Sequence, residues 1–190
     1  MNKIIWPLLL CAVLCGCGGG ETGNAVQEQY STLETARLEA EVTSHTSTDS
    51  RTFTLLCSYD ADGDAVTTVT APGELAGLTA VASGADMTMR SEGLQLPAGA
   101  SLDICPANCL PYLLRALADG YVLEQSSEAL DNTPCLRLAL DTTAPGGGKV
   151  LCAVWLDAEG LFPRYAEFSR NEQVVLTVKL LAFTCTTSEG

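Results

Sequence analysis

The chain has 190 residues and a strongly acidic composition, with 23 Asp and Glu residues against 10 Lys and Arg residues and a formal net charge of −13. This charge excludes nucleic acid as a partner, because phosphate binding requires clustered basic side chains. It also argues against direct adsorption to anionic lipid headgroups. The length suits one folded domain with a single core.

The N-terminus has the pattern of a lipoprotein signal peptide. Lys3 precedes an apolar run over residues 4–14, which is too short for a resident membrane span because a span requires roughly 17–25 apolar residues. Residues 14–17, Leu-Cys-Gly-Cys, follow the lipobox pattern, in which the last cysteine receives the lipid. The alternative, a buried helix with incidental cysteines, fits the terminal position and the lysine flank less well. We therefore expect lipidation at Cys17 and a location on the extracytoplasmic face of the cell membrane.

These features predict three segments. Residues 1–16 form the signal peptide, residues 17–24 form a lipidated cysteine with a Gly-rich tether, and residues 25–187 form a single domain. The domain opens with Val26, Tyr30 and Leu33 at helical spacing after Asn24, a suitable N-cap, which predicts a first helix over residues 25–34.

Beyond this helix the apolar residues recur with a period of two, which is typical of strands with one buried face. Turn residues such as the Asp62-Gly63 pair separate the runs. The expected strands cover residues 36–44, 52–59, 66–71, 78–82, 85–90, 93–96, 121–126, 135–140, 150–157, 164–169 and 174–185.

A second helix is predicted over residues 106–117, in the middle of the chain. Its leucines at 110, 113, 114 and 117 follow the i, i+3, i+4, i+7 spacing of one helical face, and Gly120 follows as a stop. The short connections elsewhere make neighbouring strands antiparallel. Several late strands, such as residues 150–156, are apolar on both faces, so something must cover each side of them.

The end of the chain resembles the LolA/LolB-like family of lipoprotein-sorting and lipid-binding proteins. The resemblance is carried by Val154-Trp155-Leu156-Asp157, a turn, residues 161–167 (Leu-Phe-Pro-Arg-Tyr-Ala-Glu) and the apolar strand 174–183. It implies a mainly β (α+β) fold: an incomplete antiparallel barrel, here of about eleven strands, with the N-terminal and mid-chain helices covering its concave face. Because it carries a lipobox, the chain looks more like the lipidated relatives of Gram-positive bacteria than like the soluble periplasmic carrier. Some of those relatives are spore-germination lipoproteins that bind a partner.

Two functions follow from this resemblance. The first is a non-catalytic, membrane-tethered protein that binds an acyl chain, a lipid or a lipidated peptide in the half-barrel. The second is a protein-interaction lipoprotein with a filled core, which docks an envelope or cell-wall enzyme. For the first, we expect the ligand to contact apolar residues of the middle helix and the late strands, namely Leu110, Leu113, Leu114, Leu117, Val154, Phe168 and Leu176.

Other polar groupings do not indicate an enzyme, a metal site or a cofactor. Asp60, Asp62 and Asp64 lack the glycine and the glutamate that an EF-hand loop requires later. His45, the one histidine, stands in a polar turn without a nucleophile motif. The Gly-rich segment 146–148 lacks the spacing of a phosphate-binding loop.

Six cysteines follow Cys17, which permits three disulfides in an exported domain. Cys105 and Cys109 form a C-x₃-C pair rather than the C-x₂-C of redox or zinc sites, and we expect a disulfide or a helix-start arrangement there. Spacing alone does not choose among the 15 pairings of Cys57, Cys105, Cys109, Cys135, Cys152 and Cys185.

Overall fold

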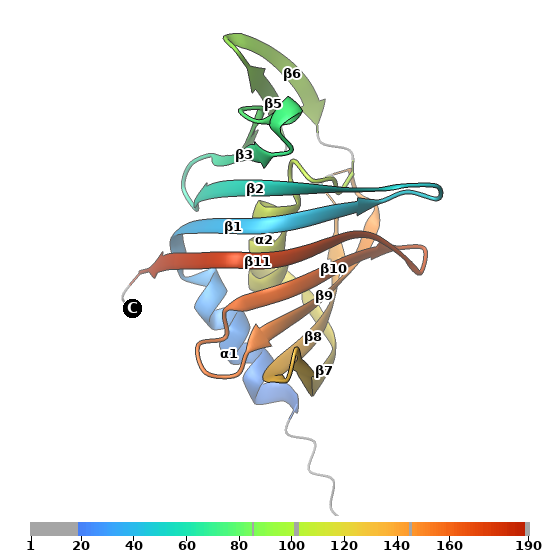
Figure 1. The fold of residues 1–190 in the computed structure, drawn as a ribbon. Helices are drawn as coiled ribbons and strands as arrows, with labels where there is room; N and C mark the ends of the chain where they lie inside the picture. The colour runs from blue at the N-terminus through green and yellow to red at the C-terminus, as the bar shows by residue number, and fades with distance from the viewer. Residues whose placement is uncertain (1–18, 85, 101–102, 145, 189–190) are drawn as a thin grey trace, which may run out of the picture.

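The computed structural model describes residues 19–84, 86–100, 103–144 and 146–188. Cys17, the predicted lipidation site, and the predicted signal peptide lie outside these residues. The described chain contains two α-helices, a short 3₁₀ helix and one sheet (Figure 1). The helices are α1 (Gly19–Ser31), η1 (Gly73–Leu75) and α2 (Cys109–Asp119). The strands are β1 (Leu33–His45), β2 (Ser50–Asp60), β3 (Ala65–Ala71), β4 (Thr79–Ser83), β5 (Asp86–Ser91), β6 (Leu94–Ala100), β7 (Tyr121–Leu130), β8 (Thr133–Thr143), β9 (Lys149–Asp157), β10 (Pro163–Arg170) and β11 (Gln173–Thr187).

The sheet is an open antiparallel half-barrel, as the sequence resemblance implied. Its eleven strands run in the order β6-β5-β4-β3-β2-β1-β11-β10-β9-β8-β7. Each half is therefore a meander, and the first and last strands of the chain join the two halves at the centre. The strands β6 and β7 stand at the two ends of this order and do not pair with each other, so the barrel is incomplete.

The alternation of apolar and polar residues along each strand determines which face of the sheet is buried. In β1 the apolar residues Leu38, Ala40 and Val42 are fully buried, whereas Glu39 and Glu41 between them are exposed. Because facing residues of neighbouring strands point to the same side of a sheet, the register extends this buried row through β2 and β11. The buried side is the concave face of the half-barrel.

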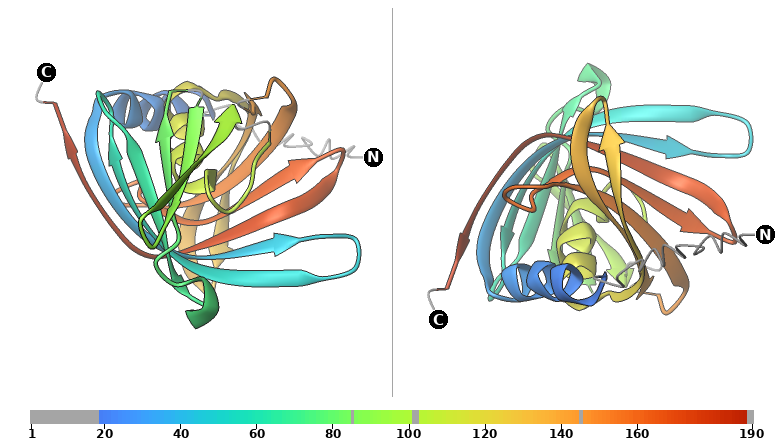
Figure 2. Two further views of the ribbon diagram at one scale, coloured as in Figure 1. Left: turned by 90° about the horizontal axis from the view of Figure 1, so that it is seen from above. Right: turned by 90° about the horizontal axis from the view of Figure 1, so that it is seen from below.

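Helix α2 lies in the concave side, and α1 lies across it next to β7 (Figure 2). The Gln27 amide of α1 donates to the Gly120 carbonyl at the end of α2, at 2.7 Å. The Tyr30 hydroxyl donates to the Leu161 carbonyl in the β9–β10 turn, at 3.1 Å. These two bonds fix α1 to the other helix and to the sheet.

The first helix begins earlier than the sequence predicted, at Gly19 instead of residue 25, and ends at Ser31, before β1 starts at Leu33. The Gly-rich pattern favours a tether because glycine is a poor helix former. Gly23, however, is buried close to β7: a Cβ atom there would lie 3.1 Å from the Gln125 side-chain oxygen. Packing on the sheet thus overrides the local preference, and residues 19–24 of the predicted tether are helical. Among the described residues, no helix has the length and apolar character that a membrane crossing requires.

Candidate functional site

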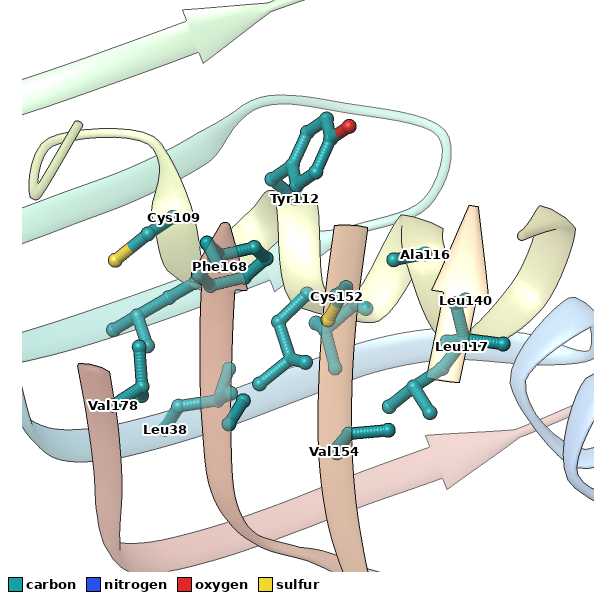
Figure 3. Packing of buried hydrophobic residues seen from close by; sticks show 14 of the residues in the cluster. Leu38, Cys109, Tyr112, Ala116, Leu117, Leu140, Cys152, Val154, Phe168 and Val178 are labelled. Atoms are coloured by element: carbon teal, nitrogen blue, oxygen red, sulfur yellow. The ribbon is translucent and has the colours of Figure 1, made fainter. Parts of the chain in front are cut away.

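The seven residues predicted to contact a ligand are brought together by the fold in one buried core. All are 0–1% exposed and belong to one apolar cluster between α2 and the late strands (Figure 3). The four leucines come from α2, whereas Val154, Phe168 and Leu176 come from β9, β10 and β11. The apolar pocket of this structure, described below, is lined by none of these seven.

Polar and aromatic contacts hold α2 in this position. The Tyr112 hydroxyl lies 2.9 Å from the Thr142 hydroxyl of β8. Its ring meets Phe168 of β10 edge-on, with 5.8 Å between ring centroids. Burial is the main cause that raises the pKa of Tyr112 above its usual value, and the contact with Thr142 acts in the opposite direction. The helix therefore fills its half of the concave side.

The other half of the concave face is progressively uncovered. One row of residues crosses the sheet from β1 to β6 with all side chains on the concave side, since its members pair directly in the register. This row is Leu38, Cys57, Thr67, Ala80, Met89 and Leu96. Leu38 is fully buried, Met89 is half-buried, and Leu96 is 66% exposed. Apolar side chains thus continue beyond the edge of the helical cover.

An apolar pocket of about 170 Å³ lies where the cover ends. No charged residue lines it, and several of its walls are half-buried, so it opens to solvent. The sheet contributes Phe53, Leu55, Thr67, Val69, Ala80 and Met89 to this pocket. Leu75 and Leu78 line it from the β3–β4 connection, and Cys105, Pro106 and Ala107 close it from the segment before α2.

This closing segment, residues 103–108, is here called the strap. Two short hydrogen bonds lie within it: the Asn108 amide donates to the Asp103 carbonyl at 2.8 Å, and the Cys105 N–H donates to the Asn108 side-chain oxygen at 2.8 Å. The Asp103 carboxylate also forms an ion pair with Arg170, at the end of β10. The strap therefore connects the pocket wall to the opposite half of the sheet.

All six cysteines of the described domain are free thiols, so none of the disulfides that the sequence permits is present. Cys57, on the concave row, is fully buried. Burial raises the pKa of its thiol to about 11. Burial likewise raises the pKa of Cys105 and, far more, that of Cys109. These thiols are protonated at neutral pH.

The remaining polar candidates take structural positions. His45 lies at the β1–β2 hairpin, with its ring nitrogens 3.0 Å from the Ser50 hydroxyl and 3.3 Å from the Thr177 hydroxyl. Neither of these two partners is an acid, which a catalytic triad requires to orient its histidine. Asp60 stabilises its own hairpin tip by accepting from the Asp62 N–H at 3.1 Å. In the part of the chain that the structure describes, no group of three or more His, Cys, Asp or Glu side chains is placed to hold a metal ion.

The convex face carries a second cluster that the sequence reading did not single out. The Arg137 guanidinium of β8 lies over the Trp155 ring at 5.4 Å from its centroid, and the Tyr165 ring packs against the same ring in a tilted orientation with 5.4 Å between centroids. The Trp155 indole N–H donates to Glu128 of β7 at 3.0 Å. The alternation of inward and outward side chains in β7, β8, β9 and β10 places these residues on the convex face. Only the pairing register of the strands shows that they are in contact.

The apolar pocket was also missed from sequence. Its sheet residues include Thr67 and Met89 in short strands with weak alternation, and its other walls come from η1 and the strap. Hydrophobic periodicity in the sequence does not predict how loops and short helices fold over a sheet. The signal that was available is the set of exposed apolar residues on β6, an edge strand with Leu94 and Leu96.

No family model matches the chain, and no curated protein matches its sequence. Solved structures do match. A DUF1329 family protein from Desulfovibrio piger is 13% identical, with a TM-score of 0.52 over 90% of this chain and 94% of that chain. An uncharacterized conserved protein from Thermus thermophilus is 8% identical, with a TM-score of 0.51 over 89% of this chain and 88% of that one. A LolA superfamily protein from Nitrosomonas europaea is 11% identical, with a TM-score of 0.47 over 88% and 94%.

Identities this low concern the fold alone. The features that the sequence resemblance implied are all present: eleven antiparallel strands, an open barrel, an N-terminal helix and a mid-chain helix on the concave side. The chain therefore has a LolA-like fold.

Proposed function

We propose that the chain is a non-catalytic lipoprotein, anchored through Cys17 on the extracytoplasmic face of the cell membrane, that binds a hydrophobic ligand at the open half of its concave face. The observation that carries this proposal is the uncharged pocket under β2–β5 together with the exposed apolar residues that continue it on β6. The seven residues predicted from sequence then support the site from behind and do not contact the ligand.

The size and chemistry of the pocket favour an acyl chain. A volume of about 170 Å³ is below the roughly 300–1,000 Å³ of sites that enclose a whole small molecule. A linear chain can place one end in the pocket and lie along Met89 and Leu96 with the remainder. Each buried methylene contributes about 0.8 kcal/mol, so the ligand needs no charged contact with the pocket.

The position of α1 relates this site to the proposed anchor. Helix α1 begins two residues after Cys17, and its first turns lie next to β7. The β5–β6 hairpin lies at the opposite end of the molecule (Figure 1). Lipidation at Cys17 would therefore hold the β7 end near the bilayer and turn the pocket away from it.

The experiment compares two substitutions of inward-facing alanines. Ala80→Phe fills the pocket, whereas Ala166→Phe overpacks the core under α2, which typically costs about 1–3 kcal/mol. Protein purified without detergent is extracted with organic solvent, and the extract is analysed by mass spectrometry for lipid. We expect wild type and Ala166→Phe to carry lipid, Ala166→Phe to melt at a lower temperature, and Ala80→Phe to keep its melting temperature and lose the lipid. Lipid retained by a folded Ala80→Phe protein would contradict the pocket as the site.

The second function, docking of an envelope or cell-wall protein, is favoured by the solid core under α2 and by the convex cluster of Arg137, Trp155 and Tyr165. Aromatic and arginine side chains dominate the binding energy of many protein interfaces. This function is preferred if wild-type protein never carries lipid and if Ala80→Phe melts as much below wild type as Ala166→Phe does.

A further inference from the structure

Three thiols converge where the strap meets α2. Cys105 stands in the strap and lines the apolar pocket, Cys109 is the first residue of α2, and Cys57 of β2 lies within electrostatic reach of Cys109. The Cys109 N–H donates to the Cys105 carbonyl at 3.0 Å, so the two residues are one helical turn apart. Figure 3 shows the Cys109 side chain projecting from the start of the helix.

A disulfide between Cys105 and Cys109 requires a small local shift of the strap. Residues joined by an i to i+4 hydrogen bond are separated by roughly 6 Å along the chain axis, which lies within the range of about 4.4–6.8 Å between the Cα atoms of a disulfide. The Cβ atoms of helical neighbours lie about 5–6 Å apart and must approach to about 3.5–4.5 Å for the bond to form. After burial, the nearby Cys105 and Cys57 are the next causes that raise the pKa of Cys109, which agrees with close approach of the three sulfurs. Cys105 is half-buried, whereas Cys57 and Cys109 are 0% exposed, so an external reagent reaches Cys105 first.

We propose that Cys105 and Cys109 are an oxidisable pair, and that their disulfide fixes the strap to α2 and controls entry to the apolar pocket. The pairing stands on the geometry of the strap; the control of entry rests on the proposed function of the pocket. Cys105, Pro106 and Ala107 form one wall, and the Asp103–Arg170 ion pair already holds the far end of the strap. A covalent bond at the near end prevents the strap from swinging away from the sheet.

The reaction is an exchange with an external disulfide. The Cys105 thiolate attacks one sulfur of that disulfide and releases the other as a thiolate. The Cys109 thiolate then attacks the Cys105 sulfur and releases the second external thiol. The two protein thiols lose two protons and two electrons, and the external disulfide is reduced to two thiols. Because burial raises the pKa of Cys105, the exchange should accelerate as the pH rises above neutral.

The pairing is tested with oxidised glutathione as the disulfide. Reduced protein is incubated with it, remaining thiols are blocked with iodoacetamide after unfolding, and tryptic peptides are analysed by mass spectrometry. The chain has no Lys or Arg between Arg90 and Arg115, so one peptide carries both cysteines. We expect this peptide to escape alkylation and to lose the mass of two hydrogens, in wild type and in Cys57→Ala. A fully alkylated peptide, or a crosslink between Cys57 and Cys109, overturns the proposal.

The effect on the pocket is measured separately with N-phenyl-1-naphthylamine, a neutral fluorescent probe. We expect the probe to enter the oxidised protein roughly tenfold more slowly than the reduced protein, and the difference to disappear in Cys109→Ala, whose melting temperature serves as the folding control. Equal rates in the oxidised and reduced proteins overturn the control of entry. If the disulfide forms but neither the oxidised nor the reduced protein binds the probe, the proposed function is wrong. The proposal that Cys105 and Cys109 are an oxidisable pair is then retained.

Discussion

Gly120 ends α2 directly against the preceding turn of the same helix, so that a Cβ atom at this position would lie 2.4 Å from the Ala116 carbonyl oxygen. The backbone here is extended, with φ at −64°, so the glycine is not required for a left-handed conformation. It is required because the chain passes too close to Ala116 and to Leu140, which a Cβ atom would approach to 3.2 Å.

Gly120→Ala should therefore destabilise the domain by about 1–3 kcal/mol, the usual effect of forcing an extra carbon into a packed site. Urea unfolding followed by circular dichroism measures the change. Gly73→Ala is the matched control, since a Cβ atom there meets nothing within 4 Å, and its stability should stay within about 1 kcal/mol of wild type. Equal stabilities for the two variants would show that α2 ends with more room than the structure gives it.

The leucines of α2 are predicted to act as core residues. Leu113 is 0% exposed, whereas Leu94 on β6 is 70% exposed. Leu113→Ala should lower the free energy of unfolding by about 2–5 kcal/mol, because it leaves a cavity in a packed core. Leu94→Ala should change it by less than about 0.5 kcal/mol. A small loss at Leu113 would instead indicate a wall that a ligand or water already occupies.

The buried Cys57 thiol makes the stability dependent on alkaline pH. Its pKa is about 11 in the folded domain against an ordinary value of 9.0, so above pH 9 the unfolded chain releases this proton while the folded chain retains it. Stability from this group is complete below pH 9 and is lost as the pH rises to about 11. Two pKa units correspond to about 3 kcal/mol.

The measurement compares wild type with Cys57→Ala between pH 8 and about 11. Both proteins retain the other titrating groups, so their contributions cancel in the difference. We expect wild type to lose about 2–3 kcal/mol relative to the variant over this range. Parallel stability curves would mean that Cys57 releases its proton as easily in the folded chain as in the unfolded one.

The predicted anchor is tested at Cys17. Cys17→Ser removes the thiol that receives the lipid, so the cells should accumulate an uncleaved precursor that does not incorporate labelled palmitate. The wild-type chain should be labelled and should partition with membranes. The neighbouring Cys15→Ser variant is the control and should remain labelled. Normal labelling of Cys17→Ser would refute the lipobox assignment.

Much of the fold was predictable because its signals are local. The alternation of Leu38, Ala40 and Val42 with charged residues marks a strand with one buried face, and the leucine stripe of α2 marks a helix with one buried face. The predicted start of α1 was wrong because its Gly-rich first turns pack against β7 and the helix packs on α2, and both partners are distant in sequence. The site was predictable only in part: apolar periodicity identifies which residues are buried, but Phe168 in a solid core and Met89 in an open pocket look alike in sequence.

The pairing of β1 with β11 at the centre of the sheet has a kinetic consequence. The two strands come from opposite ends of the domain, and their register joins Leu33 to Thr187. Closing so long a loop is entropically unfavourable, and chains dominated by such distant contacts fold slowly. The two meanders cannot assemble into one sheet until the last strand is synthesised. A chain cut before residue 173 would therefore leave β1 and β10 as unpaired edges of two separate sheets.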